Sequence, residues 1–249
     1  LSPLLNQIVI SNLYAKLGNY YFNVDKYQKA KALFEQALDN HNGVDNINNA
    51  WIIGRLGCVH RNIGNNKKSV TLLEQALKIY TAYYGVKHLE TTLISMYLAS
   101  SYRHLGKYIE AKNLLEHVLT IYKKEYGIGY IKTARASVYL GNVYRNIGEY
   151  KKAKELLAQA LHIYKRYYGE DNMHTAWVSV RLAAAHRAVG EYHEARKLIE
   201  EGIQIYKKHS GDSSHEMAWS LTHLGRVLRD LKDYTGSQKL LEQALIILK

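Results

Sequence analysis

A 42-residue period runs through this sequence and constrains its fold more than any other feature. Each copy opens on a leucine, and five of these leucines are 42 residues apart: Leu56, Leu98, Leu140, Leu182 and Leu224. Leu17 precedes Leu56 by 39 residues and opens a further copy. Self-similarity at such a period indicates a repeat architecture, in which each unit buries its apolar face on the next.

Each copy predicts two helices. In the first, apolar residues recur at i, i+4, i+7 and i+11, as in Ile52, Leu56, Val59 and Ile63, which form one stripe of a 3.6-residue helix. Glycine follows this stripe at Gly64, Gly106, Gly148 and Gly190, where it suits the left-handed residue that ends a helix. No alternation typical of a strand competes, so the sequence predicts an all-α fold.

The copies resemble tetratricopeptide repeats, and most closely the 42-residue variety of kinesin light chains. The residues that carry the resemblance are Leu140, Gly141, Tyr144, Gly148, Glu149, Tyr150, Ala153, Leu157 and Ala160. The resemblance implies a right-handed α-α superhelix (solenoid) of six TPR-like helix-turn-helix repeats, whose first helices line a concave groove. It also implies a protein-interaction scaffold.

The chain departs from the family pattern at three places. Its only proline is Pro3, so the usual proline between repeats is missing. His88 alone echoes the His-Pro that precedes each first helix in kinesin light chains. Val138 and Tyr139 stand where those proteins carry paired asparagines. The resemblance therefore concerns architecture and does not indicate a motor subunit.

The repeats predict one solenoid domain over residues 1–249, with copies at about 10–43, 49–85, 91–127, 133–169, 175–211 and 217–249. The chain starts without an initiator methionine, and we expect it to be a fragment of a longer protein. It ends inside a sixth second helix, "LLEQALIILK", with no polar cap. An apolar face there needs a cover, so self-assembly is one candidate function.

A column of arginines recurs five residues after the leucine, at Arg61, Arg103, Arg145, Arg187 and Arg229. The first copy has Phe22 in this column. Five residues rotate a helix by about 500°, which places the arginines roughly 140° from the core-facing leucine. Packing of the local core does not require arginine on that outer face.

Two further columns lie near the arginines. The three tryptophans of the chain, Trp51, Trp177 and Trp219, stand five residues before the leucine, and asparagines occur at Asn62, Asn142 and Asn146. The resemblance places these residues in the peptide-binding groove. Arginine matches carboxylates, asparagine pairs with a peptide backbone, and tryptophan anchors interfaces. We therefore predict that the groove binds an acidic peptide or helix of a partner protein.

A structural interpretation stays open for the same columns. An arginine can lay its stem on the next helix and pair with a nearby acid such as Asp230. The tryptophans can pack between adjacent first helices. Tyr80, Tyr122, Tyr164 and Tyr206 recur near the end of the second helix and are interpreted as packing residues.

Composition narrows the function classes. The net charge of +12 favours an acidic partner, and nucleic acid is the alternative to a peptide, although no dense cluster of lysine and arginine supports it. No apolar run approaches the ~20 residues of a membrane span. The single cysteine, Cys58, fits a reducing, cytoplasmic location. We find no catalytic, metal-binding or nucleotide-binding motif, so we expect a non-enzyme without a cofactor or metal, of undetermined oligomeric state.

Overall fold

The computed structural model describes residues 3–40, 47–211 and 214–248, and over these residues the chain forms helices and no strands. The twelve helices are α1 (Pro3–Asn23), α2 (Tyr27–Asp39), α3 (Ile47–Asn62), α4 (Asn66–Tyr84), α5 (Leu89–His104), α6 (Tyr108–Tyr126), α7 (Ile131–Asn146), α8 (Tyr150–Tyr168), α9 (Met173–Ala188), α10 (Tyr192–Ser210), α11 (His215–Asp230) and α12 (Tyr234–Ile247). They alternate as the first and second helices of six repeats, which confirms the predicted all-α class.

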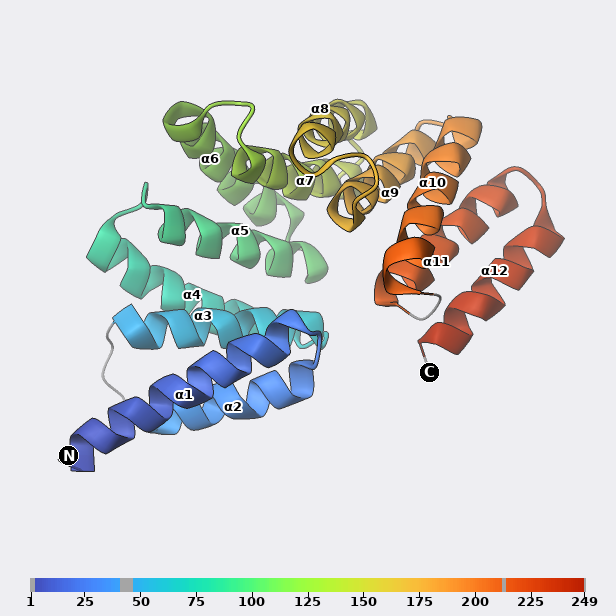
Figure 1. Cartoon of the computed structure of the whole chain (residues 1–249). Helices are drawn as coiled ribbons and strands as arrows, with labels where there is room; N and C mark the ends of the chain where they lie inside the picture. Colours follow the sequence, from blue (N-terminus) through green and yellow to red (C-terminus); the bar gives the residue numbers. More distant parts are fainter. Residues whose placement is uncertain (1–2, 41–46, 212–213, 249) are drawn as a thin grey trace. The chain divides into compact units, whose positions relative to one another are not determined.

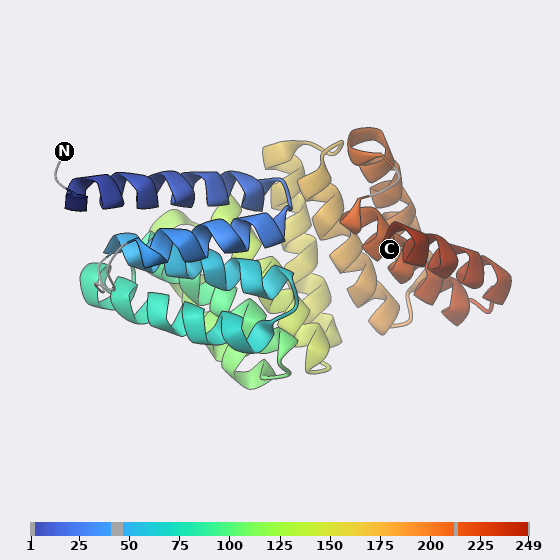
Figure 2. The ribbon, with the colours of Figure 1, turned by 90° about the horizontal axis from the view of Figure 1, so that it is seen from below.

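The chain forms two compact units, Leu1–Val118 and Leu119–Lys249, called unit 1 and unit 2 below. Unit 1 holds α1 to α5 and the first part of α6, and unit 2 holds the remainder of α6 and α7 to α12. Within each unit, successive helices pack side by side, α1 on α2, α2 on α3 and α3 on α4 in unit 1, as Figures 1 and 2 show. In unit 2, α7 to α12 follow the same order.

The turn inside each repeat depends on one left-handed residue. In the four middle repeats this residue is glycine, as predicted, with φ between +77° and +87° at Gly64, Gly106, Gly148 and Gly190. In the first and last repeats the same place holds Asp25 (φ 58°) and Lys232 (φ 67°). A side chain makes this conformation less favourable, so the two outer repeats form the same turn at a higher conformational cost.

The core of each unit consists of apolar residues from both helices of every repeat. In unit 1, Phe34, Leu73 and Val59 are fully buried, and in unit 2 Ile199 and Val227 are fully buried. Small residues allow the two helices of a repeat to approach closely. A Cβ added to Gly57 would lie 2.8 Å from Cγ of Leu73, and one added to Gly141 would lie 2.8 Å from Cγ of Leu157.

The leucines that define the period are buried in five of the six repeats. Leu17 differs, because 45% of its surface is exposed. A preceding second helix packs on the helices that carry Leu56, Leu98, Leu182 and Leu224, and no described helix precedes α1. Leu17 therefore keeps the repeat position of the buried leucines, but its side chain is exposed and does not belong to the core.

Candidate functional site

The arginines predicted in unit 1 lie on neighbouring first helices, Arg61 on α3 and Arg103 on α5. The guanidinium of Arg61 lies 5.2 Å from the centre of the Tyr97 ring, and its Nη2 donates to Oδ1 of Asn62 at 3.2 Å. Nη2 of Arg103 lies 2.8 Å from Nε2 of His104. Partial burial and the guanidiniums of Arg103 and Arg61 lower the pKa of His104 to about 4.

Trp51 packs between helices of unit 1. Its ring lies 6.1 Å from the ring of Phe34 on α2, in an edge-to-face arrangement, and the guanidinium of Arg55 lies 5.4 Å from the indole centre. Trp51 is partly buried as a result. The structural interpretation of the tryptophan column therefore applies at this position, and a partner can reach only part of the ring.

In unit 2 the predicted arginines lie on three successive first helices, Arg145 on α7, Arg187 on α9 and Arg229 on α11. Nε of Arg187 donates to Oδ2 of Asp230 at 2.6 Å, and Nη2 of Arg229 lies 3.4 Å from Oδ1 of the same carboxylate. The pairing with Asp230 that the sequence left open is thus formed. It ties α9 to α11 and also shows that this face can hold a carboxylate between two arginines.

Three aromatic side chains and one arginine are in contact on α9 and α11 of unit 2. The guanidinium carbon of Arg181 is 3.9 Å from the ring centre of Trp177 and 4.6 Å from that of Trp219. Its Nη1 donates to the backbone carbonyl oxygen of Trp177 at 3.0 Å. The Trp219 ring lies 4.1 Å from the imidazole of His223. We call Trp177, Arg181, Trp219 and His223 the Trp–Arg stack.

His223 is the most buried member of the Trp–Arg stack, with 6% of its surface exposed. Its Nδ1 has no hydrogen-bond partner in the part of the chain that the structure describes. Burial and the guanidiniums of Arg145, Arg226, Arg181 and Arg187 lower the pKa of His223 to about 3. The imidazole is therefore neutral at physiological pH, and it lies where positive charge from α7, α9 and α11 converges.

The three predicted asparagines differ in accessibility. Asn62 and Asn146 are exposed next to Arg61 and Arg145, at the ends of α3 and α7. Asn142 is buried, with 8% of its surface exposed, so a peptide backbone has little access to it. Of the predicted asparagines, Asn62 and Asn146 are the ones placed to meet a partner.

Sequence reasoning missed a column that lies one residue before the leucine. It holds Arg55, Tyr97, Tyr139, Arg181 and His223. Its members contact the predicted columns: Tyr139 lies 6.4 Å from Trp177, and Arg181 and His223 lie against tryptophans. The signal was present, because Trp51 and Arg55, Trp177 and Arg181, and Trp219 and His223 are pairs at i and i+4, which share one face of a helix.

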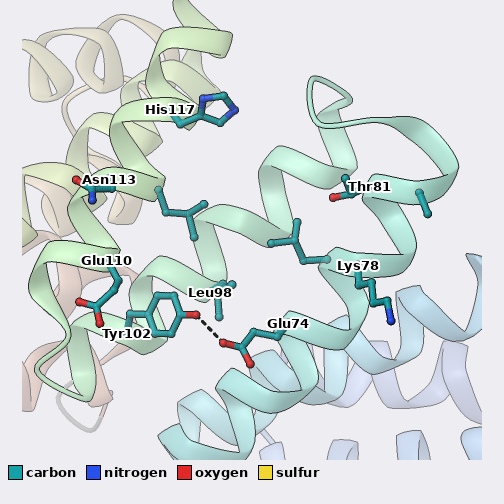
Figure 3. Close-up of a pocket in the computed structure, with 11 residues that line it drawn as sticks. Glu74, Lys78, Thr81, Leu98, Tyr102, Glu110, Asn113 and His117 are labelled. Carbon is teal, nitrogen blue, oxygen red and sulfur yellow. Dashed lines mark hydrogen bonds between the residues drawn. The ribbon is translucent and has the colours of Figure 1, made fainter.

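A separate apolar groove of about 790 Å³ lies in unit 1 between the second helices α4 and α6, with α5 behind it (Figure 3). Leu77, Leu98 and Leu114 contribute apolar surface. Oη of Tyr102 donates to Oε1 of Glu74 at 2.6 Å across the groove. The pKa of Tyr102 is raised to about 12, mainly by burial and secondly by this hydrogen bond. The groove involves none of the predicted site residues.

Three further properties of the described residues concern metal ions, membranes and the thiol. Over the described residues, no three histidine, cysteine or acidic side chains gather in a way that could hold a metal ion. No helix in the described ranges is long and apolar enough to cross a membrane. Cys58 is fully buried, and burial raises the pKa of its thiol, which makes the thiol less reactive.

The repeats of this chain match a known protein family. The model of the tetratricopeptide repeat matches residues 9–82, 90–166, 132–208 and 174–249. The chain belongs to the tetratricopeptide-repeat family. This confirms the resemblance drawn from the leucines and glycines, and it makes the chain a protein-interaction scaffold, since stacked repeats present an extended surface to protein or peptide partners. No curated protein sequence matches the chain.

Solved structures agree with this family. A Podosopora anserina putative kinesin light chain with nearly identical TPR-like repeats is 26% identical, with a TM-score of 0.62, over 78% of this chain and 92% of that one. BtubC from P. vanneervenii is 20% identical, with a TM-score of 0.63, over 99% and 91%. A Rap protein complexed with Competence and Sporulation Factor is 16% identical, with a TM-score of 0.75, over 96% and 75%. The last two comparisons concern the fold alone.

Proposed function

We propose that this scaffold binds an acidic segment of a partner protein on the outer faces of its first helices, with α7, α9 and α11 of unit 2 as the main contact. One observation carries the proposal: four arginines from these three helices converge on the buried, neutral His223. Positive charge that gathers on one face favours the binding of an anionic ligand there.

The chemistry of the Trp–Arg stack fits such a ligand. A guanidinium offers a rigid fork of donors that matches a carboxylate, and the two indoles supply apolar surface for the rest of a side chain. Neighbouring helices pack about 8–10 Å apart. An extended peptide advances about 3.3 Å per residue, so successive first helices would meet carboxylates several residues apart.

Asp230 supports the proposal from within the chain. Its carboxylate lies between Arg187 and Arg229, at 2.6 Å and 3.4 Å from their nitrogens. A ligand carboxylate that reached Arg187 would compete with Asp230 for the same donors. The affinity of the site for an acidic peptide is therefore expected to depend on whether residue 230 is charged.

Isothermal titration calorimetry with a panel of Glu- and Asp-rich peptides tests the proposal. The double variant Arg145→Gln/Arg187→Gln removes two positive charges from the proposed face. The matched control Lys151→Gln/Lys197→Gln removes two positive charges from exposed positions on the second helices α8 and α10 of the same unit. We expect the first variant to lose affinity by at least about 100-fold, since each of the two charge-assisted hydrogen bonds contributes about 1.5–3 kcal/mol, and the control by less than about threefold.

The same titration separates a peptide from a nucleic acid. Equal losses in both variants would show that binding follows net charge and not the proposed face. A single-stranded RNA that binds more tightly than every acidic peptide, and loses affinity in the Arg145→Gln/Arg187→Gln variant, would favour stacking of bases on the tryptophans instead. Circular dichroism of each variant checks that it is folded.

A further inference from the structure

The apolar groove between α4 and α6, called the α4–α6 groove below, has small side chains where later repeats have long basic ones. Thr81 and Ala82 line it near the end of α4. The second helices of the next three repeats carry basic pairs at the same repeat positions: Lys123 and Lys124 on α6, Lys165 and Arg166 on α8, and Lys207 and Lys208 on α10. The small pair on α4 leaves this part of the groove open.

The floor of the α4–α6 groove is apolar. Leu98 on α5 is buried, and Leu77 on α4 and Leu114 on α6 are partly buried on either side of it. The lining residues run from Glu74 to Ala82 along α4 and from Glu110 to His117 along α6. At 1.5 Å per residue, each of these segments is roughly 10–12 Å long, which is the length of about two turns of a helix.

One end of the groove is acidic. Glu74 and Glu110 lie there on either side of Tyr102, whose Oη donates to Oε1 of Glu74 (Figure 3). Burial, and then Glu74 and Glu110, raise the pKa of Tyr102 to about 12, so the phenol keeps its proton. Lys68 and Lys152 stand at the repeat position of Glu110. In a chain with a net charge of +12, this end therefore has the opposite sign to the molecule as a whole.

An α-helix suits the groove better than an extended peptide. The floor offers leucine side chains, so an extended segment laid on it would leave backbone N–H and C=O groups without partners. A helix satisfies these groups internally and presents apolar residues at i, i+4 and i+7 on one face. A positive charge at the edge of that face complements the carboxylates of Glu74 and Glu110.

We propose that the α4–α6 groove binds an amphipathic helix of a partner protein. Three apolar residues of that helix lie on Leu77, Leu98 and Leu114. A lysine or arginine beside them meets Glu74 and Glu110. The proposal is independent of acidic-peptide binding, because the groove lies in unit 1 and its described lining residues include neither the arginine columns nor the Trp–Arg stack.

Fluorescence anisotropy with labelled model peptides tests the proposal on the full chain. The probe is a Leu–Lys peptide of about 15–18 residues, with leucines at i, i+4 and i+7 along one face. A peptide of the same composition, with its leucines spread around the helix, is the control. Because the chain is basic, general charge attraction does not favour either peptide. We expect the amphipathic peptide to bind at least roughly tenfold more tightly than the control.

The double variant Thr81→Lys/Ala82→Lys gives α4 the basic pair that α6 already carries, so it is expected to fold. It places two long side chains in the groove. The matched control Thr71→Lys/Gln75→Lys adds the same charge at exposed positions of α4 that do not line the groove. We expect the first variant to weaken binding of the Leu–Lys peptide by at least roughly tenfold and the control by less than about threefold.

The variant Glu74→Gln/Glu110→Gln tests the acidic end. It keeps the size of both side chains and an acceptor for Tyr102 but removes two negative charges. Binding of the Leu–Lys peptide should fall by at least roughly tenfold, whereas a Leu–Gln peptide of the same pattern should bind the variant and the wild type alike. Arg145→Gln/Arg187→Gln should bind the Leu–Lys peptide as the wild type does, which separates this groove from the face proposed in unit 2.

Four results would overturn the proposal. The Leu–Lys peptide could fail to bind the wild type. The control peptide with spread leucines could bind as tightly as the amphipathic one. Thr71→Lys/Gln75→Lys could weaken binding as much as Thr81→Lys/Ala82→Lys, although circular dichroism shows both to be folded. Sedimentation velocity could also show a dimer of the wild type that Thr81→Lys/Ala82→Lys abolishes, which would make a second copy of the chain the occupant.

Discussion

The same repeat columns build different surfaces in the two units. In unit 1, Arg55 lies 5.4 Å from the ring of Trp51 and 5.7 Å from that of Phe22, and Arg61 rests on Tyr97. In unit 2, the equivalent Arg181 lies closer to its rings, between two tryptophans. The arginines five residues after the leucine are nearly constant, whereas the column one residue before the leucine varies. The variable column therefore decides which side chain lies against each tryptophan: Arg55 at Trp51, Arg181 at Trp177 and His223 at Trp219.

Removal of Arg181, the arginine of the Trp–Arg stack, should produce the largest difference in unfolding free energy between the two units. Arg181→Ala takes the guanidinium from between two indoles and removes its hydrogen bond to the carbonyl of Trp177. We expect a loss of about 2–3 kcal/mol in the free energy of unfolding of unit 2. Arg55→Ala, the equivalent change in unit 1, should cost only about 1 kcal/mol. Hydrogen exchange read by mass spectrometry measures each unit separately.

Equal losses in the two units would contradict this ranking, because they would mean that the second tryptophan adds nothing. If Arg181→Lys has the same unfolding free energy as the wild type, stacking is also not the cause of the loss. Lysine keeps the charge but lacks the planar group that lies on both rings.

The next comparison concerns pH. The pKa of His223 is about 3 in the folded chain and about 6.5 when unfolded. The unfolded chain therefore binds the proton more tightly. The contribution of neutral His223 to the unfolding free energy is complete above about pH 6.5, and it is lost as the pH falls toward 3. Between pH 7 and pH 5, unit 2 should lose about 2 kcal/mol of unfolding free energy through this residue.

Chemical denaturation at the two pH values, followed by hydrogen exchange in α11, measures this loss. The variant His223→Phe keeps a ring beside Trp219 but has no group that titrates. It should show a smaller dependence on pH than the wild type by about the same 2 kcal/mol. If the two proteins respond alike to pH, another group is responsible for the effect.

The smallest expected effect separates stability from binding within unit 2. Asp230→Asn weakens a partly exposed ion pair with Arg187, and we expect a loss of about 1 kcal/mol in unfolding free energy. The same change removes the carboxylate that competes for Arg187, so affinity for an acidic peptide should rise severalfold. Calorimetry on the variant measures the affinity. A fall in affinity would count against Arg187 as a contact of the ligand.

Most of the fold could be predicted from the sequence, because a helix period and a repeat period are local signals. Leu56 and Gly64 illustrate this: one is buried and the other has positive φ, as their positions require. The exposure of Leu17 could not be predicted in the same way. It depends on which neighbour covers the helix, and a repeated pattern does not contain that information.

The candidate site was predictable in part. The columns of Arg187 and Trp177 were identified from spacing, but their partners were not all found. Asp230 was named as an acid near the arginines, and it pairs with Arg187 across two helices. The contact of Arg181 with both tryptophans depends on the distance between α9 and α11, which no pattern within one helix specifies. The predicted role of these residues in binding a partner stays a prediction.

The turns at Asp25 and Lys232 have a consequence for cooperativity. In a stack of repeats, folding can nucleate anywhere, and each repeat is stabilised mainly by its nearest neighbours. The turns of the first and last repeats lack glycine, so we expect these two repeats to open before the four middle repeats when the chain fluctuates. Any contact that covers α1 or α12 would therefore also lengthen the lifetime of the folded outer repeats.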